Sequence, residues 1–141
     1  MYFTATGQPL TFNLYYMTKE RFLLALPEHI HVVGKHSTKH VLINGIHLIP
    51  DGSLRIRNHS PDGFNWGYAG SGPAQFALAL LMLYVDADTA QLHYQDLKFG
   101  WVAGLPQSDF DHHVNLRWVM DTIFKAGSPF EAAKFIKSLQ L

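Results

Sequence analysis

The chain of 141 residues contains no cysteine and no surplus of charge of either sign. Without cysteine it cannot form disulfides, use a thiolate nucleophile or bind zinc through sulfur, and this absence fits a reducing compartment. Eleven Lys and Arg residues balance eleven Asp and Glu residues. No overall electrostatic field therefore attracts a phosphate backbone or an anionic membrane, so binding of bulk nucleic acid is disfavoured outside a local cationic patch.

Long hydrophobic segments are also missing. The longest apolar run, FALALLMLYV, is about half as long as a bilayer-spanning helix needs to be, and the start MYFTATGQP lacks the basic and apolar regions of a signal peptide. Hydrophobic residues nevertheless make up 48% of the chain, which is enough for one core. We therefore expect a single globular domain, residues 1–141, that is cytoplasmic and has no membrane partner.

Strand patterns dominate the first half of the sequence. The expected strands are PLTFNLYY, HIHVV, HVLINGIHLI and LRIRNH. Asn44 and Gly45 tolerate the positive φ angles of a type I′ turn, so the third pattern predicts a β-hairpin. Between the first two, Thr18 is expected to cap a short helix, KERFLLAL, that Pro27 ends.

Helical patterns follow from Gly72 onward. Residues 76–85 are almost all apolar, which indicates a buried central helix. Further helices are expected to start at Asp88, at Asp109 or Asp111 with an end at Gly127, and at the capping box of Ser128, Pro129 and Glu131. The whole pattern predicts an α+β fold in which a small antiparallel sheet in the first half packs against a buried central helix and two to three further helices.

One segment, RNHSPDGFNWGYAGSGPAQ, concentrates glycines and aromatic residues between the last expected strand and the central helix. The two-residue period of a strand places Arg55, Arg57 and His59 on one face. Ser71 is interpreted as the N-cap of the helix, whose free N–H groups attract anions. If the strand and the helix start lie side by side, these groups predict a site for a phosphate or carboxylate.

Aromatic residues of the same segment would stack on a base or another flat group bound there. The candidate ligand-binding residues are Arg55, Arg57, Asn58, His59, Phe64, Trp66, Tyr68, Ser71, Gly72 and Gln75. The alternative is structural: the glycines allow close packing of helix and sheet, the aromatic side chains fill the end of the core, and the arginines are solvated. The sequence leaves both interpretations open.

Neither catalytic residues nor a cofactor are predicted. The sequence around Ser71 lacks the G-x-S-x-G pattern of a nucleophile elbow, because Ala69 and Pro73 stand where glycines are needed. His59 and Asp62 could form an acid–base pair, but an aspartate so close to a histidine in a loop is commonly a turn former.

The nine histidines raise the question of a metal site. His29 and His31 would share one face of a strand, and His112 and His113 neighbour Asp111. No metal-ligand signature is present, and adjacent histidines on a helix diverge by about 100°. We therefore predict no metal site.

The stretch IRNHSPDGFNWGYAGSGPAQFALALL, followed by LHYQDLKFGWVAGLP, resembles the domain of unknown function family 6166 of phages, plasmids and bacterial genomes. The resemblance covers about residues 40–106, so that residues 1–39 and the C-terminal helices in residues 107–141 look like additions. It implies a phage or mobile-element setting and no defined activity.

Three functions are expected as alternatives. The first is a non-enzymatic accessory protein of a phage or mobile element that binds a host protein or complex, such as a defence or CRISPR component, in the host cytoplasm. The second is a binder of a nucleotide or single-stranded nucleic acid at the candidate site. The third is a small enzyme that uses His59.

Overall fold

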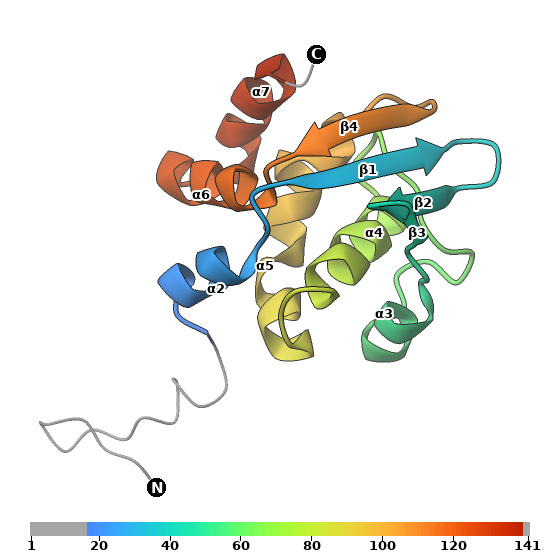
Figure 1. Cartoon of the computed structure of the whole chain (residues 1–141), viewed down its shortest axis with the longest axis horizontal. Helices are drawn as coiled ribbons and strands as arrows, with labels where there is room; N and C mark the ends of the chain where they lie inside the picture. The colour runs from blue at the N-terminus through green and yellow to red at the C-terminus, as the bar shows by residue number, and fades with distance from the viewer. Residues whose placement is uncertain (1–16, 140–141) are drawn as a thin grey trace, which may run out of the picture.

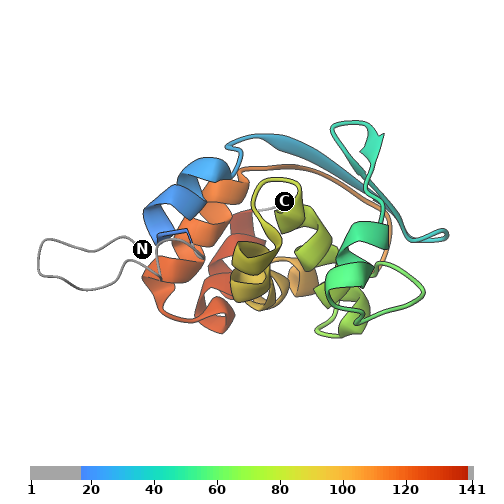
Figure 2. The ribbon, with the colours of Figure 1, turned by 90° about the horizontal axis from the view of Figure 1, so that it is seen from below.

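A four-stranded antiparallel sheet lies on one side of the molecule and the helices cover its other face (Figures 1 and 2). The computed structural model describes residues 17–139. The strand order is β3-β2-β1-β4. The strands are β1 (Ile30–Lys35), β2 (His40–Ile43), β3 (Ile46–His47) and β4 (Phe110–Val114).

Helices make up most of the remaining chain. They are α2 (Lys19–Ala25), α3 (Asp51–Ile56), α4 (Ser71–Met82), α5 (Ala87–Gly100), the 3-10 turn η1 (Val102–Gly104), α6 (Leu116–Ala126) and α7 (Pro129–Leu139). The predicted α+β fold class is thereby confirmed. None of the helices in residues 17–139 is long and apolar enough to cross a membrane.

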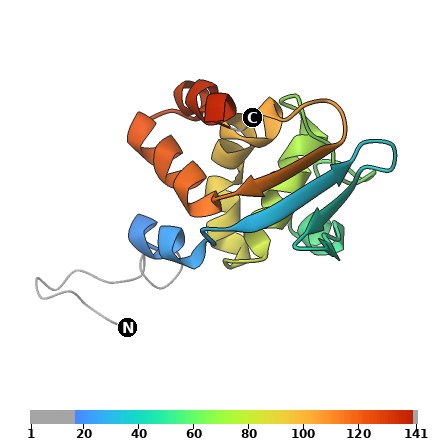
Figure 3. The ribbon, with the colours of Figure 1, turned by 45° about the horizontal axis from the view of Figure 1, so that its top comes forward.

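Helix α4 is the buried centre of the fold, as its sequence predicts. Every residue from Gly72 to Leu81 is buried, and α4 packs along α5. A helix that is apolar on all sides gains the most by being enclosed, because no face of it benefits from water. Figure 3 shows the sheet in front of α4 and α5, so the sheet closes one side of this core.

Local signals in the sequence were reliable guides to several boundaries. Asn44 and Gly45 have φ angles of 51° and 81° and join β2 to β3, which confirms the predicted hairpin turn. The Thr18 side chain accepts a hydrogen bond from the N–H of Arg21 and caps α2 as predicted. Gly127, with a φ of 74°, ends α6. The predicted strand PLTFNLYY lies outside the described residues.

The prediction of a strand at LRIRNH is wrong. Residues 51–56 form the short helix α3, and the chain continues as a loop. Apolar and polar residues alternate over only four positions here, which is too few to distinguish the two-residue period of a strand from the 3.6-residue period of a helix. The carboxylate of Asp51 favours the start of a helix, and the hydroxyl of Ser53 donates to the carbonyl of Pro50 at 2.8 Å. Arg55 and Arg57 therefore do not line a sheet face.

The helix caps predicted at three positions are also wrong. Gly70, not Ser71, is the N-cap of α4 and offers no side-chain bond. Asp86, not Asp88, caps α5 by accepting from the N–H of Thr89 at 2.8 Å.

The third error concerns the segment after Pro106. Asp109 and Asp111 do not cap α6, because residues 110–114 form β4, and the cap is Asn115. β4 pairs with β1 across a sequence separation of about 80 residues, with His31 opposite His113. No local sequence pattern predicts such a pairing. The pairing adds β4, a strand from the second half of the chain, to the sheet.

Candidate functional site

Gln75 is the centre of a hydrogen-bond network that fixes the segment singled out in the sequence. Its Oε1 accepts from the backbone N–H groups of His59 at 2.8 Å and Ser60 at 3.3 Å. Its Nε2 donates to the hydroxyl of Ser53 at 2.8 Å. Gln75 and Ser53 are both buried. One amide in α4 thus holds both α3 and the loop that follows it, which explains a polar residue in an apolar helix.

Replacing Gln75 with leucine should lower the free energy of unfolding by about 1–3 kcal/mol. The change keeps the side-chain volume but leaves the hydroxyl of Ser53 and the N–H of His59 without their partner. Urea denaturation measures the effect. The control is Gln91→Leu, since Gln91 is half-buried on α5 and bonds only to its own helix; it should change stability by less than about 0.5 kcal/mol. Equal losses in both variants would contradict the role of the network.

His59 packs against Tyr94 of α5. Its Nε2 is hydrogen-bonded to the hydroxyl of Tyr94 at 2.7 Å. Burial, and to a lesser degree the charges of Arg57 and Lys98, lower the pKa of His59. Among the hydrogen bonds of residues 17–139 none joins His59 to Asp62, so the geometry shows no acid–base pair between these two residues.

Two of the three aromatic candidates are part of the core. Phe64 and Trp66 are 5% and 0% exposed, and the indole N–H of Trp66 donates to the carbonyl of Ser108 at 2.9 Å. Tyr68 is 41% exposed. The close packing expected of the glycines is evident at Gly72, where an added Cβ would lie 2.5 Å from that of Asn65.

The structure thus divides the ten candidate residues into two groups. The exposed or partly exposed ones, which are able to touch a ligand, are Arg55, Arg57, Asn58, His59, Tyr68 and Ser71. The buried ones are Phe64, Trp66, Gly72 and Gln75. The loop that carries Arg57 and His59 does lie beside the first turns of α4, because Gln75 binds it there. Ligand binding by the exposed group stays a prediction.

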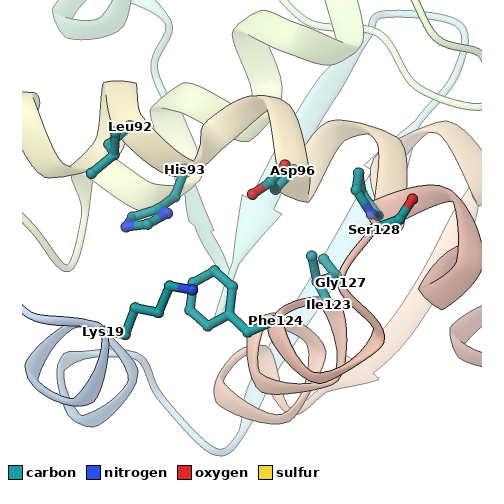
Figure 4. Close-up of a pocket in the computed structure, with 9 residues that line it drawn as sticks. Lys19, Leu92, His93, Asp96, Ile123, Phe124, Gly127 and Ser128 are labelled. Atoms are coloured by element: carbon teal, nitrogen blue, oxygen red, sulfur yellow. The ribbon is translucent and has the colours of Figure 1, made fainter.

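A hollow of about 370 Å³ between α2, α5 and the end of α6 is lined by two further titratable groups whose pKa burial shifts, His93 and Asp96 (Figure 4). Lys19 extends over the ring of Phe124, with Nζ 4.8 Å from the centroid. Burial, followed by the charge of Lys19, lowers the pKa of His93 to about 4, and burial raises the pKa of Asp96. His93 is also stacked on Phe22 at 4.2 Å, which makes its imidazole mainly a core group.

A second hollow, the β3–α4 groove, is more apolar. It lies between β3, the start of α3 and the end of α4, and is lined by His47, Leu48, Ile49, Gly52, Ser53, Ala79, Met82 and Leu83. Ile49 is 66% exposed and Leu83 is 51% exposed. Sequence reasoning missed this groove, because residues 47–49 and 81–83 read as ordinary core segments. Nothing in the local sequence shows that Ile49 and Leu83 face water.

Comparison with known proteins gives one match. The model of a family of unknown function, DUF6166, matches residues 32–123, a wider range than the resemblance suggested, from within β1 into α6. No curated protein and no solved structure shows significant similarity to the chain. The matched range contains the Gln75 network, the β3–α4 groove and the β1–β4 pairing from Val32 onward, and it covers about two thirds of the sequence. The chain therefore belongs to the DUF6166 family, with added segments on both sides of the family region.

Proposed function

We propose that this protein is a non-enzymatic accessory protein of a phage or mobile element, which acts in the host cytoplasm by binding a host protein through the β3–α4 groove. The observation that carries the proposal is the exposure of large aliphatic side chains around that groove. Exposed apolar surface beside a concave site is typical of protein-binding surfaces.

The groove is a hollow with exposed aliphatic side chains at its rim. Ile49 and Leu83 line it, and Ile46, 74% exposed, lies at the adjoining turn of the hairpin. Burying side chains of this kind contributes about 1.5–3 kcal/mol each. β3 is also the terminal strand of the sheet, and its outer edge offers backbone groups to a partner.

Charge near the groove indicates what the partner carries. Arg55 and Arg57 are exposed at the end of α3, which starts in the groove. Among residues 17–139 neither arginine makes a salt bridge. An amphipathic segment with apolar residues for the groove and carboxylates for the arginines would match both features. The proposed partner is therefore a host protein that presents such an acidic, apolar segment.

A display library of protein fragments from a bacterial host tests this. Enriched fragments should share apolar residues flanked by Asp or Glu, and purified fragments should bind with a Kd that rises at least tenfold in Leu83→Glu, a loss of about 1.4 kcal/mol. Leu24→Glu is the matched control, since Leu24 is 69% exposed on α2 and distant in the fold. Fragments without this character, or equal Kd values for both variants, would overturn the proposal.

The nucleotide and enzyme alternatives have weaker support in the geometry. The burial of Phe64 and Trp66 leaves Tyr68 as the exposed aromatic ring of the candidate site, and stacking platforms for single strands normally use several rings. A thermal-shift screen with nucleotides tests the nucleotide alternative: stabilisation that is lost in Arg57→Ala would favour nucleotide binding over the groove.

A further inference from the structure

Four metal-ligand side chains gather on the outer face of the sheet, far from the β3–α4 groove. His31 projects from β1, and Asp111 and His113 project from β4; a ligand atom from each lies within 4.8 Å of the other two. His29, just before β1, joins them, because its Nε2 lies 3.3 Å from Nδ1 of His113. We call these four residues the β1–β4 histidine cluster.

The strand register brings the cluster together. His31 lies directly opposite His113, and Asp111 is two residues before His113 on the same strand. Residues two apart on a strand share a face. The inner face carries Ile30, Val32, Phe110 and Val114, which are buried, so the histidines and the aspartate necessarily face outward, on the side that the helices do not cover (Figure 3).

The observed strand removes one of the two reasons for predicting no metal site, the divergence of adjacent histidines on a helix. That prediction treated residues 111–113 as helical, where His112 and His113 diverge. In the observed strand, alternation sends His112 to the other side and places His113 and Asp111 together beside His31. Neighbouring Glu28 is not part of the cluster, since it forms a salt bridge with Arg117 at 2.5 Å.

The distances agree with a small coordination sphere. Tetrahedral Zn²⁺ with Zn–N bonds of about 2.0–2.1 Å places its ligand atoms about 3.3–3.4 Å apart. The separation of 3.3 Å between the ring nitrogens of His29 and His113 equals this value. The rings of His31 and His113 are stacked at 4.5 Å and 8°, an arrangement that aligns their edges.

The His31–Asp111 pair is closer than two metal ligands would be. Nε2 of His31 and Oδ1 of Asp111 are hydrogen-bonded at 2.5 Å. The carboxylate has the freedom to move, because the side chain of Asp111 is 68% exposed.

We propose that His31, Asp111 and His113, with His29 as the fourth donor, bind one divalent transition-metal ion of the zinc type. Imidazole and carboxylate together suit Zn²⁺, Co²⁺ and Ni²⁺, whereas Mg²⁺ and Ca²⁺ require oxygen ligands. The ion would join β1 to β4, the pairing with the greatest sequence separation in the sheet. His29 and His31 precede the region matched by the family model, so the family match does not cover the whole cluster. The proposal does not rest on the β3–α4 groove, because the two share no residue.

Metal titration of the full chain without a polyhistidine tag tests the proposal. A hundredfold excess of ZnCl₂ over Kd should raise the Tm by about 5–10 °C, and MgCl₂ should not. Co²⁺ should produce visible absorption bands typical of tetrahedral coordination. Calorimetric Kd values for Zn²⁺ should rise at least tenfold in His113→Ala and in Asp111→Asn.

The matched control is His40→Ala. His40 is exposed on β2 in the same sheet and faces His47 without a carboxylate, so its removal should leave Zn²⁺ affinity and the cobalt spectrum unchanged. Circular dichroism confirms that each variant is folded; exposed His113 and Asp111 are not core residues. Absence of Zn²⁺ binding to the wild-type chain, or an equal loss of affinity in His40→Ala, would overturn the proposal.

Discussion

Replacing Trp66 with alanine is expected to lower the free energy of unfolding by about 3–5 kcal/mol, a large share of the roughly 5–15 kcal/mol that stabilises an ordinary domain. Trp66 is fully buried and lies edge-on to Phe76 of α4 at 6.2 Å and to Phe110 of β4 at 5.2 Å. It therefore fills the space between the central helix and the sheet. Its removal would leave a large cavity and free the carbonyl of Ser108.

Urea denaturation with fluorescence detection measures this effect, and two further variants separate its causes. Trp66→Phe keeps an aromatic ring but removes the indole N–H, so a smaller loss of about 1–3 kcal/mol is expected. Trp118→Ala removes a tryptophan that is only partly buried on α6, and should cost less than Trp66→Ala. If Trp66→Ala were as stable as Trp118→Ala, the assignment of Trp66 to the core would be contradicted.

Acidification from pH 7 to pH 4 should destabilise the fold by about 3 kcal/mol through His93 alone. His93 is 7% exposed between Phe22 and Phe124. Burial, and then the charge of Lys19, lower its pKa from 6.5 to about 4. Because the pKa is depressed in the folded state, the unfolded chain binds the proton first. The stabilisation is complete above pH 6.5 and is lost as the pH falls toward 4.

Urea denaturation at pH 7, 5.5 and 4 measures this dependence. In His93→Phe the ring stacking is kept and the titration removed, so the loss of stability between pH 7 and 4 should shrink by about 3 kcal/mol. Exposed His47 supplies the control, and His47→Gln should retain the wild-type profile. The burial of His59 lowers its pKa in the same direction and adds to the acid sensitivity that remains. An unchanged profile in His93→Phe would show that His93 is not responsible.

Local chemistry explains why some of these features could be foreseen. The hairpin turn at Asn44 and Gly45 and the end of α6 at Gly127 each depend on one or two backbone angles that few residues tolerate. The burial of α4 follows from its composition alone. These elements need no information about the rest of the chain.

The errors occurred where distant residues decide the outcome. Leu54 and Arg55 read as part of a strand, yet they lie in α3, which is held through Ser53 by Gln75, about 20 residues further along. Residues 110–114 read as the start of a helix, but β1 supplies their hydrogen-bond partners and makes them a strand. In both cases the conformation that the local sequence prefers is overridden, because the hydrogen bonds made with distant residues contribute more free energy than the local preference.

The sequence by itself determined the fold class, the central helix, the turns and the family, because these depend on composition, periodicity and residue types that act within a few positions. Only the tertiary structure decided that the aromatic residues of the motif fill the core, that aliphatic side chains surround a groove, and that three histidines and an aspartate meet. The physical reason is that β1 and β4 are paired by backbone hydrogen bonds across 80 residues, and such bonds leave no signature in either strand alone.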